Sequence, residues 1–490
     1  MPVASPFRST GLALGAALLV TGLAGATAAR ADTLQDALTE AYDTNPQLLS
    51  ERAHLRAVDE NVPQALANWR PTVSFTGSAG AERTTNSPSE PNLTYLLAGP
   101  GCVVGIPCST GIPVTLPSSL PAVTNVTPQT IDVNITQPLY RGGRTIAQTA
   151  EAEKTVEAER ARLIVTEESV FYSVIQAYLD VVRDQATLEL SINNEQLLSK
   201  QLESTREQFR VGTLTRTDVA QAEAQYASAI ASRNQAEGTL QVSRANYERA
   251  VGHLPPKLTA TSLRPVLPAT RDQAITLAAN KNPNVIAALF AEDAARDQVK
   301  VIRGQLLPTL SVVGDYQRLN DTEFPRSDTT VASVVARMSM PLYEGGAIYS
   351  QTRQAEQTVG QMRGQTDDAR RAAVQGATQA WETMTSDRAQ EKALVESVTA
   401  ADVAFHGTQE EQRVGTRTVL DVLITEQTLF SAQVSLVSTR HDVALAEFNL
   451  ALQIGRLSAA DLSLKVRLYD VNRHYHAVRD KWVGFGSGQQ

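Results

Sequence analysis

A ten-residue segment built around a glycine turn occurs twice in this chain of 490 residues. RVGTLTRTDV begins at Arg210, and the near copy RVGTRTVLDV begins at Arg413, 203 residues later. QPLYRGG from Gln137 returns as MPLYEGG from Met340 after the same 203 residues. Because unrelated landmarks keep one spacing, the sequence predicts two tandem copies of one structural unit.

Landmarks nearer the N-terminus repeat at a longer step. Asn45-Pro46 returns as Asn282-Pro283, and Pro71-Thr72 returns as Pro308-Thr309, both after 237 residues. The first copy therefore holds 34 extra residues, the difference between 237 and 203. We place them in 85–128, which is rich in Pro, Gly, Ser and Thr and is expected to be an inserted loop. The predicted units are a first repeat over 32–268, a second over 269–470 and a C-terminal tail over 471–490.

The N-terminus has the features of a secretory signal. Arg8 precedes an apolar run over 11–25, and Ala29-Arg30-Ala31 is a cleavage site of the small-x-small type. This predicts a signal peptide over 1–31. A transmembrane anchor is the weaker reading, because the run is short and rich in Gly and Ala.

Charge and cysteine usage narrow the functional classes. The formal net charge is −8, without basic clusters, which argues against a nucleic-acid partner. Cys102 and Cys108 both lie in the inserted segment of an exported chain. A local disulfide is therefore favoured over a two-cysteine metal site.

The segment 144–210 contains 67 residues without Gly or Pro and predicts a very long helix. The matching segment 347–414 lacks Pro. Return helices are expected over 218–251 and 418–454. Within the first long helix two neighbouring apolar seams run side by side, which indicates a helix that packs on both flanks, as in a wall or ring. The seams are Val170, Val174, Ala177 and Val181, and Phe171, Ile175, Tyr178 and Val182.

Strands are expected near 71–84, 129–138, 308–319 and 331–340. In the second of these, Ile131, Val133 and Ile135 alternate with polar residues. One reading is a half-buried sheet on a soluble core. The other is a membrane barrel with a polar lumen, favoured because no helix offers a broad apolar face to cover the strands. Four strands cannot close a barrel, so several chains would have to share one.

The repeated RVGT turns, the PLYxGG junctions and the two-copy plan together resemble the TolC-type outer membrane efflux proteins. The resemblance implies an α+β membrane protein that forms a homotrimer, with four strands from each chain in a shared twelve-stranded β-barrel. It also implies a long helical tunnel and a mixed belt formed by 255–268 and the segment after Gly455. The implied location is the outer membrane of a Gram-negative bacterium, in contact with lipid and extending into the periplasm.

The implied function is the exit duct of a tripartite efflux or type I secretion machine. Its partners would be a periplasmic adaptor and an inner membrane pump, which are expected to set the cargo. Carried over residue by residue, the hairpin tips that would contact the adaptor are Arg210, Val211, Gly212 and Thr213, with Arg413, Val414, Gly415 and Thr416.

The gate implied by the resemblance comprises Asp218, Arg417 and Asp421. Both aspartates have a second explanation, since a carboxylate in the first turn of a helix is stabilised by the helix dipole. Gln412 and Ile424 depart from the family pattern, where a gating tyrosine and a second ring carboxylate can occur.

The sequence contains no catalytic constellation. The six histidines are scattered, and the pair in His474-Tyr475-His476 falls in a basic tail expected to be loosely ordered. The sequence therefore predicts a protein that is not an enzyme and that needs no cofactor or metal. The alternative class is an exported helical-hairpin protein that never enters a membrane.

Overall fold

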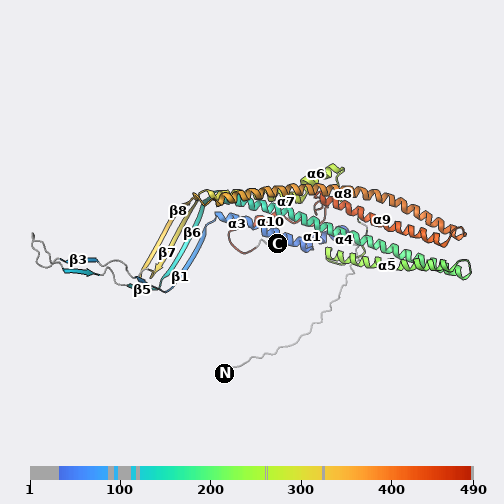
Figure 1. Cartoon of the computed structure of the whole chain (residues 1–490), viewed down its shortest axis with the longest axis horizontal. Helices are drawn as coiled ribbons and strands as arrows, with labels where there is room; N and C mark the ends of the chain where they lie inside the picture. Colours follow the sequence, from blue (N-terminus) through green and yellow to red (C-terminus); the bar gives the residue numbers. More distant parts are fainter. Residues whose placement is uncertain are drawn as a thin grey trace, which may run out of the picture.

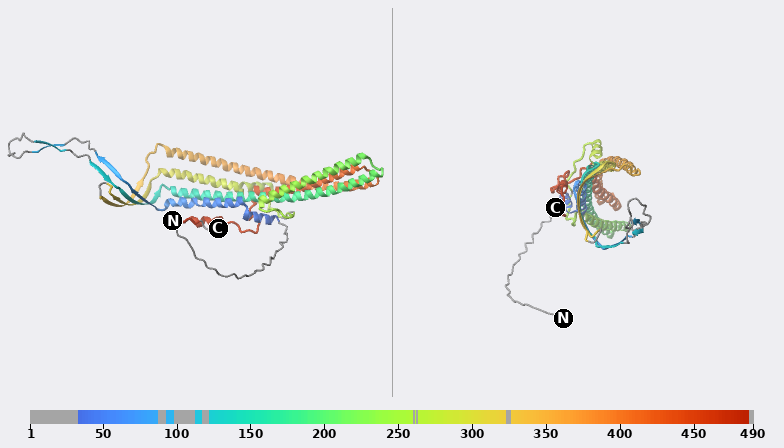
Figure 2. Two further views of the ribbon diagram at one scale, coloured as in Figure 1. Left: turned by 90° about the horizontal axis from the view of Figure 1, so that it is seen from below. Right: turned by 90° about the vertical axis from the view of Figure 1, so that its left-hand side faces the viewer.

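The computed structural model describes residues 33–86, 93–97, 112–116, 122–259, 261, 263–322 and 326–486. The predicted signal peptide, Cys102 and Cys108 lie outside these residues. The molecule is elongated, with a β-sheet towards one end and two helical hairpin tips at the other (Figure 1). Seen along its length, the sheet and the helices follow an open arc (Figure 2).

The sheet contains four antiparallel strands in the order β1-β6-β7-β8. They are β1 (Thr72–Ala79), β6 (Gln129–Arg141), β7 (Thr309–Asn320) and β8 (Asp328–Ser339). The expected strand near 71–84 is interrupted after Ala79. Both repeats contribute two strands each, and β6 of the first pairs with β7 of the second. Strands β1 and β8 form the two edges.

The expectation of a loop over 85–128 needs correction. Short strands continue the antiparallel course of β1 and β6 as a ribbon beyond the sheet (Figure 1). β2 (Glu82–Asn86) pairs with β5 (Ala122–Val126), and β3 (Leu93–Leu97) pairs with β4 (Ile112–Leu116). Segments such as AVTNV are rich in Val and Thr, which favour strands. Overall Pro and Gly content concealed this local preference.

Two helical hairpins form the part of the molecule that extends away from the sheet (Figure 1). α4 (Arg144–Arg210) returns through α5 (Arg216–Val251), and α8 (Ala347–Arg413) returns through α9 (Val419–Gln453). These bounds agree with the expected helices to within two residues. The apolar seams of α4 are buried except for the half-buried Val182, and Phe171 and Tyr178 are fully enclosed. α4 packs against α5, α7 and α9, as a helix with two seams should.

The helices that precede the strands of each repeat were not anticipated from the sequence. The first repeat contains α1 (Leu34–Thr44), α2 (Pro46–Asp59), α3 (Asn61–Leu66) and the 3-10 turn η1 (Ala67–Trp69). The second contains α6 (Arg271–Lys281), α7 (Pro283–Arg303) and η2 (Gly304–Leu306). They pack along α4 and α8. None of the helices in the described ranges combines enough length and apolar character to cross a membrane.

The C-terminal tail is more ordered than expected over 471–478, where it forms α10 (Val471–Val478). His474 is buried there, and its Nδ1 lies 3.0 Å from Oδ2 of the buried Asp59 on α2. This long-range contact anchors the tail to the first repeat. Histidine spacing alone gave no sign of it.

Candidate pore wall and hairpin tips

The strand register places most apolar side chains on one face of the sheet. Val73, Ile135, Gly314 and Val334 lie side by side across the four strands. Within one chain this face is uncovered, since Val73 is 68% exposed and Val334 is 80% exposed. An apolar sheet face without a covering layer requires another apolar phase or another molecule.

The opposite face is predominantly polar. Ser74, Asn134, Asp315 and Ser333 form the adjacent row across the sheet. A sheet with one apolar face and one polar face is what a barrel wall between lipid and a water-filled lumen needs. Both edge strands have a free side within the chain, so a single copy leaves the wall open.

The two hairpin tips have nearly the same structure. At the first tip, the Thr213 hydroxyl donates to the Gln208 carbonyl at 2.9 Å. At the second, Thr416 donates to the Glu411 carbonyl at 2.9 Å. Gly212 and Gly415 adopt φ of 82° and 79°, a conformation that glycine adopts without strain. In each RVGT turn, the glycine supplies the backbone conformation and the threonine supplies a hydrogen bond that closes the turn.

Each tip presents a valine to solvent. Val211 is 72% exposed and Val414 is 76% exposed. The preceding arginines pair within their own helices, Arg210 with Glu207 at 2.5 Å and Arg413 with Glu410 at 2.7 Å. An exposed apolar group surrounded by polar ones suits a docking surface better than a free end.

Asp218 and Asp421 both cap the helix in which they lie. In each case one carboxylate oxygen, Oδ2, accepts from the backbone N–H and the hydroxyl of the preceding threonine, Thr215 or Thr418. The distances are 2.9 and 2.7 Å for Asp218, and 2.9 and 2.8 Å for Asp421. The backbone donors lower the pKa of both carboxyls, which favours their ionised forms.

Within one chain, Arg417 forms its ion pair with Glu411 and not with Asp421. Its Nε donates to Glu411 Oε2 at 2.9 Å, within the same hairpin. This hydrogen bond and the Glu411 charge raise the pKa of Arg417. Ile424, at one of the two positions that depart from the family pattern, is 55% exposed on α9. The gate assignment therefore stays a prediction about assembled chains.

Two of the buried glutamates have a strongly raised pKa, and neither was anticipated from the sequence. Glu426 on α9 is 3% exposed, and neither carboxylate oxygen has a partner among the described residues. Burial raises its pKa to about 8. Glu168 on α4 accepts from the Leu457 N–H at 3.1 Å, and burial raises its pKa also to about 8. Only the fold shows these positions to be buried, because both lie in ordinary charged helical sequence.

A charged network joins α4 to α9 above the tips. His441 Nε2 lies 3.0 Å from Asp180 Oδ1, and its Nδ1 lies 2.9 Å from Asp442 Oδ1. Burial lowers the pKa of His441, but the contacts with both aspartates outweigh this and raise it. Arg183 also pairs with Asp180, at 2.9 Å. His441 therefore links α9 to α4.

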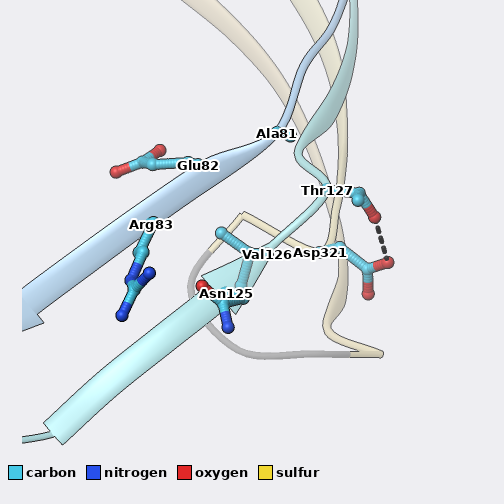
Figure 3. Close-up of a pocket in the computed structure, with 7 residues that line it drawn as sticks. All are labelled: Ala81, Glu82, Arg83, Asn125, Val126, Thr127 and Asp321. Atoms are coloured by element: carbon cyan, nitrogen blue, oxygen red, sulfur yellow. Dashed lines mark hydrogen bonds between the residues drawn. The ribbon is translucent and has the colours of Figure 1, made fainter.

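The described residues line open surface pockets and assemble no metal site. Within the described ranges, no three His, Cys, Asp or Glu residues gather as a metal site. An open pocket of about 280 Å³ lies where the β2–β5 ribbon leaves the sheet (Figure 3). There the Thr127 hydroxyl donates to Asp321 Oδ2 at 3.4 Å, which links the ribbon to the end of β7.

Comparisons with known proteins agree with this geometry. A family model described as outer membrane efflux protein matches residues 37–253 and 274–456. The outer membrane efflux protein BepC of Brucella suis is 33% identical over 481 residues, covering 98% of this chain and 97% of BepC. The outer membrane protein TolC of Vibrio cholerae is 25% identical over 441 residues, covering 88% of this chain and 92% of TolC.

Solved structures share the fold at low sequence identity. VceC from Vibrio cholerae aligns with a TM-score of 0.67 and 20% identity, covering 86% of this chain and 96% of VceC. The open state of the MtrE channel from Neisseria gonorrhoeae aligns with a TM-score of 0.68 and 17% identity, covering 86% and 88%. With the family model matched across most of both repeats, the chain belongs to the outer membrane efflux protein family.

Proposed function

We propose that three copies of this chain form one exit duct through the outer membrane and the periplasm. The protein is an outer membrane channel of the efflux and secretion class, a family of channel proteins. A barrel shared by several copies is supported by the open four-stranded sheet, whose uncovered apolar face adjoins two unpaired edges. The number three comes from the resemblance to the family. Lipid does not tolerate open edges, and four strands are too few to close a barrel.

The test combines assembly with conduction. Protein purified from the outer membrane should have the mass of three chains in detergent and should give stepwise conductance in planar bilayers. A monomeric protein that passes no ions would refute the proposal. A water-soluble periplasmic protein would favour the helical-hairpin alternative.

The six tips of the proposed trimer are the surface that meets a periplasmic adaptor, which in turn contacts an inner membrane pump. This proposal is supported by the similarity of the two RVGT turns to each other and by the exposure of Val211 and Val414. A cysteine at Val414 should crosslink to the adaptor in cells. A cysteine at Val242, which is 62% exposed on α5 away from the tips, is the matched control. Equal crosslinking from both positions would contradict docking by the tips.

Three copies of Asp421 around the proposed axis form an acidic ring that favours cations. Opening would separate Arg417 from acidic groups as the hairpins move apart. Asp421→Asn should reduce cation preference, measured as the reversal potential in a salt gradient. Asp402→Asn changes the same charge at a 52% exposed side chain on α8 and should have little effect. An unchanged reversal potential in Asp421→Asn would remove this residue from the gate.

A further inference from the structure

The C-terminal tail runs back to the point where β1 begins. Arg70, two residues before β1, donates from Nη1 to the Lys481 carbonyl at 2.6 Å. The Arg70 guanidinium also lies 5.0 Å from the centre of the Trp482 ring. The tail is therefore held at the junction between the sheet and the helices, although Arg70 and Lys481 are 411 residues apart in the sequence.

Residues 481–486, which we call the C-terminal loop, present large apolar side chains to solvent. The exposed fraction is 65% for Trp482 and 85% for Val483, and Phe485 is fully exposed. Gly484 adopts a φ of 104°, which turns the chain between them. The Lys481 ammonium donates to the carbonyl of residue 486 and closes the loop. The loop therefore gathers three uncovered apolar side chains within four residues.

This exposure does not come from a detached tail. Val478, three residues before the loop, is 1% exposed. Tyr475 packs against the apolar cluster that α3 and α4 form, and Arg479 Nη2 lies 3.2 Å from Glu153 Oε1 on α4. A segment that is held on both sides of an uncovered apolar group needs a partner or a second apolar phase for that group.

The equivalent junction of the second repeat also carries an exposed apolar group. The step of 237 residues takes Arg70 to Leu307, which lies two residues before β7 and is 44% exposed. In the first repeat this position is a cation, and Trp482 of the tail lies over it. Both junctions therefore place apolar surface at the same level of the molecule, although it comes from different parts of the chain.

We propose that the C-terminal loop inserts Trp482, Val483 and Phe485 into the phospholipid headgroup region of the outer membrane, in the leaflet that faces the helices. The inference rests on the membrane-spanning barrel proposed above. In that barrel the apolar face of β1 meets lipid from Val73 onward, three residues after Arg70. The loop therefore lies at the boundary between lipid and water, where tryptophan is enriched in membrane proteins.

The side on which the tail lies favours lipid over a second copy of the chain. The C-terminal segment runs along the convex side of the open arc (Figure 2). When several arcs close into a ring, they meet at their sides, and the convex side faces outwards. Outside a membrane barrel, the surrounding phase at this level is lipid.

The charges around the loop suit the phosphate groups of lipids. Arg70 and Lys481 donate their hydrogen bonds to carbonyl oxygens, which are neutral, so these bonds leave both positive charges uncompensated. Asp480 is the acidic neighbour, and it lies 4.0 Å from Arg479. Basic side chains next to apolar ones extend their charged ends towards the headgroups while their stems stay in the apolar layer.

Tryptophan fluorescence of the full-length protein tests the position of the loop. The chain contains three tryptophans, so Trp69→Phe with Trp381→Phe leaves Trp482 alone. In vesicles of phosphatidylcholine brominated close to the headgroup, its emission should be quenched relative to unbrominated vesicles and shifted to the blue relative to detergent-free denatured protein. Bromine at the methyl end of the acyl chains should quench it less.

A second single-tryptophan protein is the matched control. Trp69→Phe with Trp482→Phe keeps Trp381, which packs against an apolar cluster on α8 away from the sheet. Brominated lipid should leave its emission unchanged. The contribution of the loop can also be measured as the quenching that the three-tryptophan parent loses on Trp482→Phe alone, which changes only an exposed residue.

Water-soluble acrylamide distinguishes the other outcomes. Quenching of Trp482 by acrylamide and not by brominated lipid would place the loop in water, and quenching by neither would show it to be covered by protein, including a second copy. Either result would overturn the inference, and conductance retained in the same vesicles would leave the proposed duct standing. A protein that neither enters the vesicles nor conducts would overturn both.

Discussion

The buried carboxyl group of Glu426 should make the stability of α9 depend on pH. The group is 3% exposed, its oxygens have no partner among the described residues, and burial raises its pKa to about 8 from an ordinary 4.5. The folded chain therefore holds this proton more tightly than the unfolded chain. Stability from the protonated form is fully present below pH 4.5 and is lost as the pH rises through 8.

The magnitude follows from linkage. Each pH unit between the two pKa values lowers the free energy of unfolding by about 1.4 kcal/mol, so the loss by pH 7 amounts to about 3 kcal/mol per chain. Glu426→Gln keeps a buried polar group of similar size but cannot ionise. We expect the variant to lose the slope with pH, whatever its absolute stability.

Amide hydrogen exchange across the first three turns of α9 is the appropriate assay, because Glu168 titrates elsewhere and would confuse a global measurement. After correction for intrinsic exchange, protection in the parent protein should fall between pH 5 and 7, and protection in Glu426→Gln should stay level. Glu203→Gln removes the same charge at an exposed position of α4 and should keep the parent slope. Equal slopes in parent and Glu426→Gln would refute the assignment.

Three further changes test single contacts. Thr418→Ala removes the cap partner of Asp421 and should destabilise the start of α9 by about 1 kcal/mol in hydrogen exchange; Thr418→Ser should restore it. Ionisation of Glu168 as the pH rises towards 8 should speed amide hydrogen exchange in residues 457–462, and Glu168→Gln should abolish this increase. The same increase in exchange rate in the variant would contradict this. His474→Ala leaves buried Asp59 without its histidine partner and should cost about 1–3 kcal/mol, seen as faster proteolysis of α10; unchanged cleavage would show the tail to be anchored otherwise.

Sequence reasoning succeeded where local signals determine structure. The absence of Gly and Pro over 144–210 set the bounds of α4, and the glycine turns set where the hairpins reverse. Strand alternation at Ile131 and Ile135 identified the apolar face. These features depend on backbone propensity and on residues close together in the chain, which a single sequence displays directly.

The remainder depends on contacts between distant segments. His474 meets Asp59 across 415 residues, and Glu168 meets Leu457 across 289. Nothing in the residues beside Glu426 distinguishes it from the many solvated glutamates of the same helices. The ribbon strands were missed for a different reason, because turn-forming residues surround short Val- and Thr-containing segments and dominate the average composition.

Capping and gating are compatible roles for Asp421 because they make different demands on its carboxylate. The cap uses Oδ2, which receives both threonine donors, and does not require Oδ1. The donors fix the side chain in position, and they lower its pKa so that it stays ionised under moderately acidic conditions. A charged ring needs groups that are both held in place and ionised. The hydrogen bonds that begin α9 therefore also prepare the carboxylate for the acidic ring that we propose at the mouth of the duct.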